Sequence, residues 1–343
     1  MTRGYISGVT ILGEPFSFEG RVRSNAEWMR VKAGVIGVGK LGGTVAFAIA
    51  DQGLFDELVL CDVVESLAWA QAEDIRHGIG DLQKTVVRPG RVPDLKDADV
   101  VVIAAGQGRK PGMSRLDLLR TNAPVVAAVC RDVARIAPKA VLVLLTNPLD
   151  VMTAVAWKTS GLPRDQIVGS AAYLDSVRFR TILAGRYGAR VPEVEAAVLG
   201  EHGDRAVPVF SRVRVRGKPL ALTPQERKEI RDELTQLAAL VIGGKGGTAF
   251  GPAGCTAALV GALFSDDPTT LPASVVLDGQ YGLRDVAVGV PAILGRGRVL
   301  GVEEWALSQE EKAAFDHAGR DLAGFVSEAM AGLGAATSDA KAH

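Results

Sequence analysis

The first half of this chain alternates short runs of almost continuous apolar residues with segments of helical spacing. The apolar runs are Ala33–Ile36, Leu58–Cys61, Asp99–Ala104 and Ala140–Leu145, and the helical segments are Gly43–Gln52, Leu67–His77 and Leu116–Ala137. Strands without polar alternation are typical of parallel sheets that are buried on both faces. Strands and helices in this order are joined by right-handed crossovers. The sequence therefore predicts an α/β fold built on a doubly wound parallel sheet.

The pattern changes after Pro148, where helical segments and short strand-like runs follow one another less regularly. We predict helices over Val151–Thr159 and Ser176–Arg186, strands over Glu193–Leu199 and Val207–Val215, and helices that begin after the capping residues Thr223 and Ser308. We therefore divide the chain into an N-terminal extension (1–30), a first domain with the parallel sheet (31–150), a second, α+β domain (151–331) and a flexible tail (332–343).

The N-terminal segment does not have the character of a targeting signal. Residues 1–28 carry several charges and no continuous apolar core, which argues against a signal peptide. Met29 stands directly before the first predicted strand. We expect either an N-terminal extension or a translation start at Met29.

Charge and cysteine content argue against several classes of protein. Lys plus Arg and Asp plus Glu number 39 each, so no excess of charge favours nucleic acid or an anionic membrane as a partner. Cys61, Cys130 and Cys255 lie far apart and form no CxxC pair, which argues against a disulfide framework and a zinc site. No apolar stretch reaches the ~18 residues of a membrane span. We expect a cytoplasmic protein that binds no metal.

A glycine motif follows the first predicted strand. Gly37, Gly39 and Gly42 fit the pattern G-x-G-x-x-G, and Asp62 ends the next strand 20 residues after Gly42. The three glycines would allow a sharp turn, a close approach to a pyrophosphate, and close packing of helix on strand. A glycine-rich turn without a ligand is the alternative, but the strand, the helix and the acidic residue favour a Rossmann-type dinucleotide site. Asp62 favours NAD over NADP, because a carboxylate accepts hydrogen bonds from ribose hydroxyls and repels a 2′-phosphate.

A basic, glycine-rich loop follows the third apolar run. Residues 106–115 include Arg109, Lys110 and Arg115 and lie at the carboxyl end of the sheet, where open α/β folds bind ligands. Spacing alone leaves two interpretations open: a mobile anion-binding lid, or a solvated surface loop.

One histidine lies where acid–base chemistry would need it. The chain has four histidines; His77 and His317 fall in helical segments and His343 is the last residue. His202 lies in the polar turn 200–204, directly after an apolar strand-like run. It is the candidate base, although a lone histidine in a turn is often structural.

Asp175 and Arg178 would complete such a site. Residues three apart on a helix share a face. Asp175 would then orient the imidazole while Arg178 holds a substrate carboxylate. An ordinary helical ion pair is the alternative.

Together these motifs resemble the lactate/malate dehydrogenase family, and specifically its lactate-dehydrogenase-like malate dehydrogenases. The resemblance runs from about residue 32 to about residue 319 and includes Gly37–Gly42, Asp62, Arg109–Arg115, Thr146–Pro148, Leu174–Arg178, Gly200–Asp204, Gln280–Gly282 and Gly289–Pro291. It implies a Rossmann NAD-binding domain, a C-terminal substrate domain and a homodimer or homotetramer.

The resemblance also implies a role for each matching residue of the catalytic site. His202 matches the histidine that transfers the proton, and Asp175 matches its orienting partner. Arg178 matches the arginine that grips the C1 carboxylate of the substrate through two hydrogen bonds. Arg115 matches the lid arginine that polarises the reacting oxygen, and Asn147 matches an asparagine that contacts the substrate.

Cofactor contacts follow from the same resemblance. They fall on Gly37, Gly39, Lys40, Leu41, Gly42, Asp62, Asn122, Leu145 and Asn147. The peptide between Asn147 and Pro148 resembles one that is usually cis in the family.

Arg109 separates malate from lactate as the substrate. Lactate enzymes of the family place a glutamine there, opposite a methyl group, whereas malate enzymes place an arginine opposite a second carboxylate. An arginine opposite a methyl group would be an unpaired charge in a closed site, which is strongly unfavourable. We therefore expect reversible oxidation of (S)-malate to oxaloacetate. Glu201 is frequent, though not exclusive, among lactate enzymes, and Thr248 falls where they often carry threonine, so L-lactate dehydrogenase remains the alternative.

Two further classes of protein share part of this pattern. A NAD-dependent glycosidase shares this type of cofactor domain but needs a metal, and the sequence offers no ligand cluster. A non-catalytic NAD-binding protein would keep the glycine motif and Asp62. It would have no reason to keep His202, Asp175 and Arg178 together.

Overall fold

The structure is a computed structural model and describes residues 31–80, 84–108 and 112–339. One large sheet runs through it in the order β3-β2-β1-β4-β5-β6-β12-β13-β8-β9, with β14 paired to β13. Its strands are β1 (Lys32–Ile36), β2 (Glu57–Cys61), β3 (Val86–Gly90), β4 (Val100–Ile103), β5 (Val141–Leu144), β6 (Ile167–Gly169), β8 (Val198–Gly200), β9 (Ala206–Pro208), β12 (Thr269–Asp278), β13 (Arg284–Gly295) and β14 (Arg298–Val302). A smaller sheet contains β7 (Val194–Glu195), β10 (Arg214–Val215) and β11 (Lys218–Pro219).

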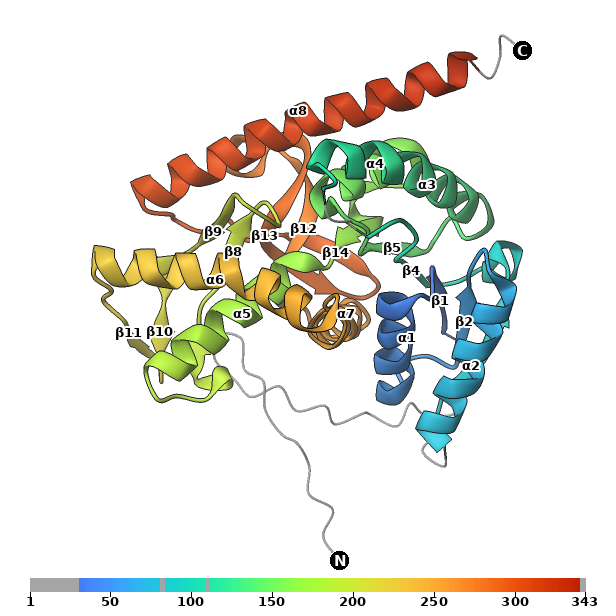
Figure 1. The fold of residues 1–343 in the computed structure, drawn as a ribbon, viewed down its shortest axis with the longest axis horizontal. Helices are drawn as coiled ribbons and strands as arrows, with labels where there is room; N and C mark the ends of the chain where they lie inside the picture. The colour runs from blue at the N-terminus through green and yellow to red at the C-terminus, as the bar shows by residue number, and fades with distance from the viewer. Residues whose placement is uncertain (1–30, 81–83, 109–111, 340–343) are drawn as a thin grey trace, which may run out of the picture.

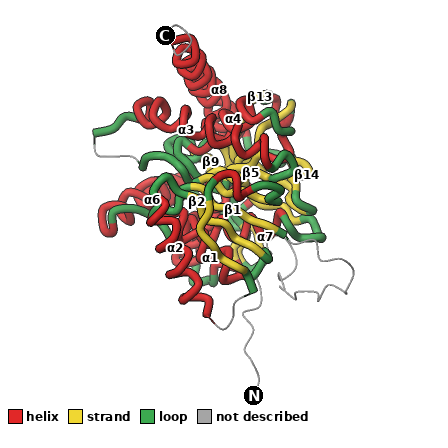
Figure 2. Tube along the Cα trace, turned by 90° about the vertical axis from the view of Figure 1, so that its right-hand side faces the viewer, coloured by secondary structure: helices red, strands yellow, loops and turns green. Residues whose placement is uncertain are grey.

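Helices surround the strands, which run through the middle of the molecule (Figure 2). They are α1 (Lys40–Gln52), α2 (Glu65–Ile79), α3 (Arg115–Ile136), α4 (Leu149–Ser160), α5 (Ala171–Arg186), α6 (Pro224–Lys245), α7 (Phe250–Leu263) and α8 (Gln309–Asp339). Helix α1 packs on α2 and α7, whereas α3 packs on α4 and α8 (Figure 1).

The strands from β3 to β6 are parallel, and β1 lies between β2 and β4. All four residues of β4 and of β5 are buried, as expected for strands that are covered on both faces. The predicted doubly wound α/β fold is therefore confirmed. The strand order changes direction between β1 and β4, which creates a crevice at their carboxyl ends where such folds bind ligands.

The parallel part of the sheet continues past residue 150, where the sequence pattern led us to divide the chain. Its last strand, β6, pairs in parallel with β5 and antiparallel with β12. The second half of the molecule therefore extends the same sheet with antiparallel strands.

Two strand predictions in the second half were wrong in extent. The segment Glu193–Leu199 forms β7 and β8, and the segment Val207–Val215 contains the end of β9, a 3-10 turn and β10. Strand β8 pairs with β9 in the large sheet, whereas β7 pairs with β10 in the small one. Each segment crosses from one sheet to the other. Because the pairing joins residues that are far apart in the sequence, the local pattern of apolar residues does not predict it.

The start of α6 and the end of α8 can be compared with their predictions from the sequence. At the start of α6, the Thr223 and Glu226 side chains each accept a hydrogen bond from the other's backbone N–H, so that capping box is confirmed. Helix α8 continues to Asp339, so the tail expected from residue 332 is helical as far as the structure describes it (Figure 1). Residues 332–339 hold two glycines beside two alanines, so the composition of the segment does not account for the helix, which continues directly from the preceding turns of α8. Within the described residues, no helix is both long and apolar enough to cross a bilayer.

Candidate active site

The glycine motif forms the turn between β1 and α1. Gly37 has a φ of 87°, and a Cβ atom there would lie 2.6 Å from the backbone nitrogen of Ala105. At Gly42 a Cβ atom would lie 1.8 Å from the carbonyl oxygen of Gly37. These two positions therefore require glycine, the first for its left-handed backbone and the second for close packing of α1 on the turn. At Gly39 an added Cβ would meet open space, as expected for a glycine that faces a ligand.

Asp62 holds this turn from the end of β2. Its Oδ2 atom accepts a hydrogen bond from the Val38 N–H at 2.9 Å, and Oδ1 accepts one from the Val64 N–H at 3.0 Å. A carboxylate offers about four acceptor positions, so capacity remains for ribose hydroxyls. Helix α1 has no side-chain cap and no acidic residue in its first turn, which leaves its positive end available to phosphates. These features fit a dinucleotide.

Lys40 and Leu41 form the first turn of α1. Leu41 is partly buried, and the Nζ atom of Lys40 donates to the carbonyl oxygen of Lys245 at the end of α6. This bond connects the cofactor turn with the second half of the molecule.

Asn122 joins two loops at the carboxyl end of the sheet. The residue is fully buried on α3, and its amide bonds with the backbone of Gln107, donating to the carbonyl at 3.0 Å and accepting from the N–H at 2.8 Å. It also donates to the carbonyl oxygen of Asn147 at 2.8 Å. Asn122 therefore connects the loops that contain Gln107 and Asn147, both of which are at the carboxyl end of the sheet. Leu145 is buried, Asn147 is exposed, and the Asn147–Pro148 peptide is cis.

The structure brings together the three residues of the expected acid–base site. The Nδ1 atom of His202 lies 2.6 Å from Oδ2 of Asp175, and Nη1 of Arg178 donates to Oδ1 of Asp175 at 3.0 Å. A carboxylate only accepts hydrogen bonds, so Nδ1 carries the proton and Nε2 is the nitrogen that can take a proton from a ligand. Asp175 and Arg178 share one face of α5, as their spacing predicts.

Burial and two carboxylates shift the pKa of His202. Burial disfavours the charged imidazolium, but the charge and hydrogen bond of Asp175, together with the charge of Asp150, outweigh it and raise the pKa of His202 above its ordinary 6.5. The imidazolium is therefore stabilised, as expected for a group that donates a proton near neutral pH.

Arg115 lies against the His202 turn from the start of α3. Its guanidinium forms an ion pair with the buried carboxylate of Glu201 and lies 5.6 Å from the ring of Phe325 on α8. A Cβ atom at Gly203 would come within 3.0 Å of Nη2 of Arg115. The structure thus places Arg115 beside His202. Arg109 and Lys110, the other cations of the basic loop, lie outside the described residues.

Asp150 was missed by the sequence analysis. It is the second residue of α4, only 3% exposed, and Oδ2 accepts a hydrogen bond from the backbone N–H of His202 at 2.7 Å. An acidic residue in the first turn of a helix has an ordinary explanation in the helix dipole. The only signal in the sequence was its position inside the otherwise apolar run that follows Pro148.

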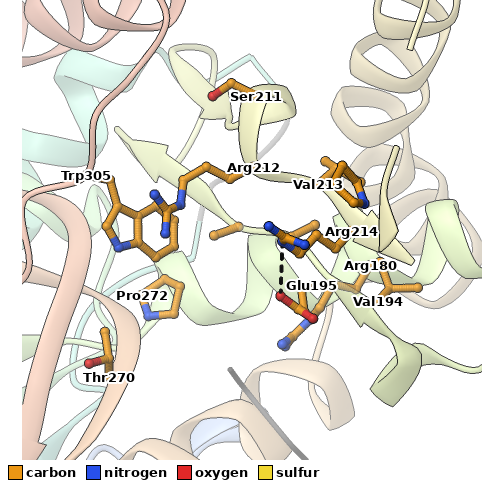
Figure 3. Close-up of a pocket in the computed structure, with 13 residues that line it drawn as sticks. Arg180, Val194, Glu195, Ser211, Arg212, Val213, Arg214, Thr270, Pro272 and Trp305 are labelled. Atoms are coloured by element: carbon orange, nitrogen blue, oxygen red, sulfur yellow. Dashed lines mark ion pairs between the residues drawn. The ribbon is translucent and has the colours of Figure 1, made fainter. Parts of the chain in front are cut away.

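A separate cavity of about 290 Å³ is lined by residues of α5, β7, β10 and β12 (Figure 3). Arg180 lines it, and Arg212 lies over the ring of Trp305 at 4.4 Å. Residues two apart on a helix do not face each other, so Arg180 and Arg178 point to different places. This cavity is therefore distinct from the His202 site.

Comparison with known proteins agrees with this geometry. Residues 31–169 match the family model described as lactate/malate dehydrogenase, NAD binding domain, and residues 172–331 match its alpha/beta C-terminal domain. The chain is 40% identical to the malate dehydrogenase of Halobacterium salinarum over 85% of this chain and 97% of that protein. It is 36% identical to the L-lactate dehydrogenase of Bacillus velezensis over 85% of this chain and 95% of that protein.

Similar solved structures also include both malate and lactate dehydrogenases. The malate dehydrogenase of Cryptosporidium parvum superposes with a TM-score of 0.84 at 31% identity, covering 88% of this chain and 100% of that one. The minor L-lactate dehydrogenase of Enterococcus mundtii gives 0.83 at 31% identity, covering 87% and 98%. The two family matches span nearly all described residues, and the first is an NAD-binding domain that carries the glycine motif. This protein is therefore an oxidoreductase of the lactate/malate dehydrogenase family.

Proposed function

We propose that this protein is a malate dehydrogenase, which catalyses the reversible NAD-dependent oxidation of (S)-malate to oxaloacetate. The observation that carries the proposal is the arginine at position 109, in a chain whose His202, Asp175 and Arg178 lie together. Arg178 provides one cation for a carboxylate, and Arg109 provides a second for the other end of a four-carbon diacid. Two cations match a dicarboxylate better than they match lactate.

In the proposed mechanism, the Gly37–Gly42 turn and Asp62 would hold NAD, which would supply the acceptor for the hydride from C2. Nε2 of His202 takes the proton of the C2 hydroxyl, and Asp175 stabilises the resulting imidazolium through Nδ1. Arg178 holds the C1 carboxylate. Arg115 supports the negative charge that develops on the reacting oxygen. In the reverse direction His202 returns the proton.

L-lactate dehydrogenase is the second candidate. Glu201 directly precedes His202, as in lactate enzymes, and several similar proteins carry the name L-lactate dehydrogenase. A non-catalytic NAD-binding protein is less well supported, because it would not need a histidine that is bonded to a carboxylate beside two arginines.

Oxidation of NADH with oxaloacetate, with pyruvate and with neither tests the proposal. We expect the kcat/KM for oxaloacetate to exceed that for pyruvate by at least tenfold, and NADPH to be the poorer donor because of Asp62. Preference for pyruvate would support the lactate alternative. The absence of any NADH oxidation with 2-oxo acids would support the non-catalytic one.

We also propose that the protein forms a homo-oligomer, a dimer or a tetramer. Large apolar side chains are exposed on neighbouring helices: Phe47 on α1, Trp69 on α2 and Phe250 on α7, which are 40%, 58% and 76% exposed. Helix α1 contacts both α2 and α7, so these side chains belong to one region of the surface. Exposed apolar patches of this kind mark protein interfaces. Sedimentation of Trp69→Glu beside the parent protein tests this, with loss of the larger species expected.

The cytoplasm is the proposed location. Cys61, Cys130 and Cys255 are buried free thiols, which fits a reducing compartment.

A further inference from the structure

The carboxylate of Asp150 connects three segments that are far apart in the sequence: helix α4, the turn that contains His202, and strand β12. It extends from the first turn of α4, accepts the His202 N–H at 2.7 Å on Oδ2, and accepts the Ser274 hydroxyl of β12 at 2.6 Å on Oδ1. Asp150 and Ser274 are both buried. The backbone of the histidine turn is therefore fixed to the scaffold at the residue that carries the imidazole.

We propose that Asp150 is a positioning residue for proton transfer by His202, and that its negative charge, together with that of Asp175, favours the imidazolium. The proposal rests on the proposed function, because it concerns the same histidine. It assigns Asp150 no contact with substrate.

In the part of the chain that the structure describes, Asp150 differs from the neighbouring carboxylates because they are paired with arginines and it is not. Asp175 is paired with Arg178 on α5, and Glu201 is paired with both Arg115 and Arg205. Among the described residues, Asp150 has only neutral hydrogen-bond donors, a backbone N–H and a hydroxyl. Its field at the imidazole is therefore not cancelled by a bonded guanidinium. The charged groups that the structure describes around His202 include Asp150 of α4, Asp175 and Arg178 of α5, Glu201 and Asp204 of its own turn, and Arg115 and Arg205 paired with Glu201.

Ionisation of Asp150 falls in the range where the enzyme would work. Burial raises the pKa of Asp150 to about 6, while the hydrogen bonds from Ser274 and from the His202 N–H oppose that rise. Above this pH the group is an anion next to the histidine turn. The charge of Asp150 in turn contributes to the raised pKa of His202.

The variant Asp150→Asn separates charge from anchoring. The amide oxygen of asparagine can still accept the His202 N–H, and its NH₂ group can donate to the Ser274 hydroxyl oxygen. The side chain keeps its size and both hydrogen bonds, whereas the negative charge is lost. The turn should therefore stay in place while the imidazolium loses one stabilising charge.

Glu311 offers a matched control. It is also a buried carboxylate, and it accepts the Ser211 N–H at 2.9 Å and the Ser211 hydroxyl at 2.6 Å. Glu311 also accepts the Ser308 N–H at 2.9 Å, so Glu311→Gln removes a buried carboxylate charge that is bonded to serine donors and not to His202. It should leave the titration of His202 unchanged.

The test measures kcat/KM for reduction of the 2-oxo acid against pH, and the NMR titration of the His202 ring. The chain has four histidines, so His202→Asn identifies the resonance. In Asp150→Asn we expect the alkaline limb of the profile and the His202 titration to move to lower pH by roughly one unit, the low end of the effect of a nearby opposite charge. A limb and a titration that coincide with those of the parent would overturn the proposal.

Failure of the proposed function and failure of the role proposed for Asp150 give different results. If the parent protein reduces no 2-oxo acid, the proposed function is wrong, while the NMR titration still tests the effect of Asp150 on His202. If Asp150→Asn does not fold, the parent labelled with ¹³C-aspartate serves instead. The His202 resonance should then respond as Asp150 ionises, and a resonance that passes through that transition unchanged would overturn the proposal.

Discussion

Arg115 and Glu201 form an ion pair that joins the first turn of α3 to the residue directly before His202. Glu201 is 1% exposed and also lies 3.4 Å from Arg205, which in turn lies 2.6 Å from Asp321 on α8. The guanidinium that we assign to the reacting oxygen is thus held beside the histidine turn by a buried carboxylate. A cation placed in advance where charge develops lowers the barrier more than one that must move there.

Glu201→Gln should therefore disturb Arg115 without touching His202. We expect turnover to fall roughly 10–100-fold, since misplacement by about 1 Å can cost two orders of magnitude. Kinetics with the 2-oxo acid measure the effect. The matched control is Glu328→Gln, which removes the exposed α3–α8 ion pair with Arg120 and should change activity little. Equal activity of the two variants would contradict the role given to Glu201.

His202→Asn should remove the proton donor while keeping the size of the side chain. We expect kcat to fall by ~10²–10⁴, the usual contribution of general acid–base catalysis. Thermal unfolding, measured in parallel, should show that the variant is folded. Activity within a fewfold of the parent would exclude His202 from the mechanism.

The rate of reduction should depend on pH through His202, because reduction consumes the proton of the imidazolium. Burial acts against the charged form, but Asp175 and Asp150 raise the pKa of His202 above 6.5. The rate of reduction should persist above that pH and fall as pH rises through the raised pKa, while the rate of oxidation rises over the same interval. Profiles of kcat/KM in both directions measure this. A reduction rate that increases with pH above neutrality would contradict it.

Arg109→Gln should shift the preference from oxaloacetate toward pyruvate. Removing a charged hydrogen-bonding partner costs about 1.5–3 kcal/mol, so we expect the kcat/KM for oxaloacetate to fall roughly 10–100-fold. Side-by-side assays with both acids give the ratio. Arg120→Gln, the same exchange at an exposed position of α3, is the control. Unchanged preference for oxaloacetate would refute the argument for the substrate.

Asp150 should make the stability of the fold depend on pH. Its pKa is raised by burial from 3.8 to about 6, so the stability it contributes is complete below the unfolded pKa and is lost as pH rises through the folded pKa. The shift corresponds to ~3 kcal/mol. Asp150→Asn should therefore gain stability relative to the parent as pH rises through that interval. Denaturant unfolding at both ends of the interval measures the gain, and a difference that is independent of pH would contradict it.

Much of the fold and the site could be predicted from the sequence because local patterns determine them. Unbroken apolar runs specify parallel strands, Gly37 and Gly42 fill positions where a Cβ atom would clash, and the spacing of Asp175 and Arg178 places them on one helical face. The candidate base His202 could be identified by elimination among four histidines.

Tertiary structure alone decided what these residues touch. The buried position of Asn122, the ion pair of Arg115 with Glu201, and the bonds of Asp150 to His202 and Ser274 join residues that are distant in the chain. The splitting of the segment Glu193–Leu199 between two sheets has the same origin. The sequence by itself determined which chemical groups are present and which elements carry them. Their partners, and with them the charge state of His202, depend on burial and long-range packing, which no local spacing encodes.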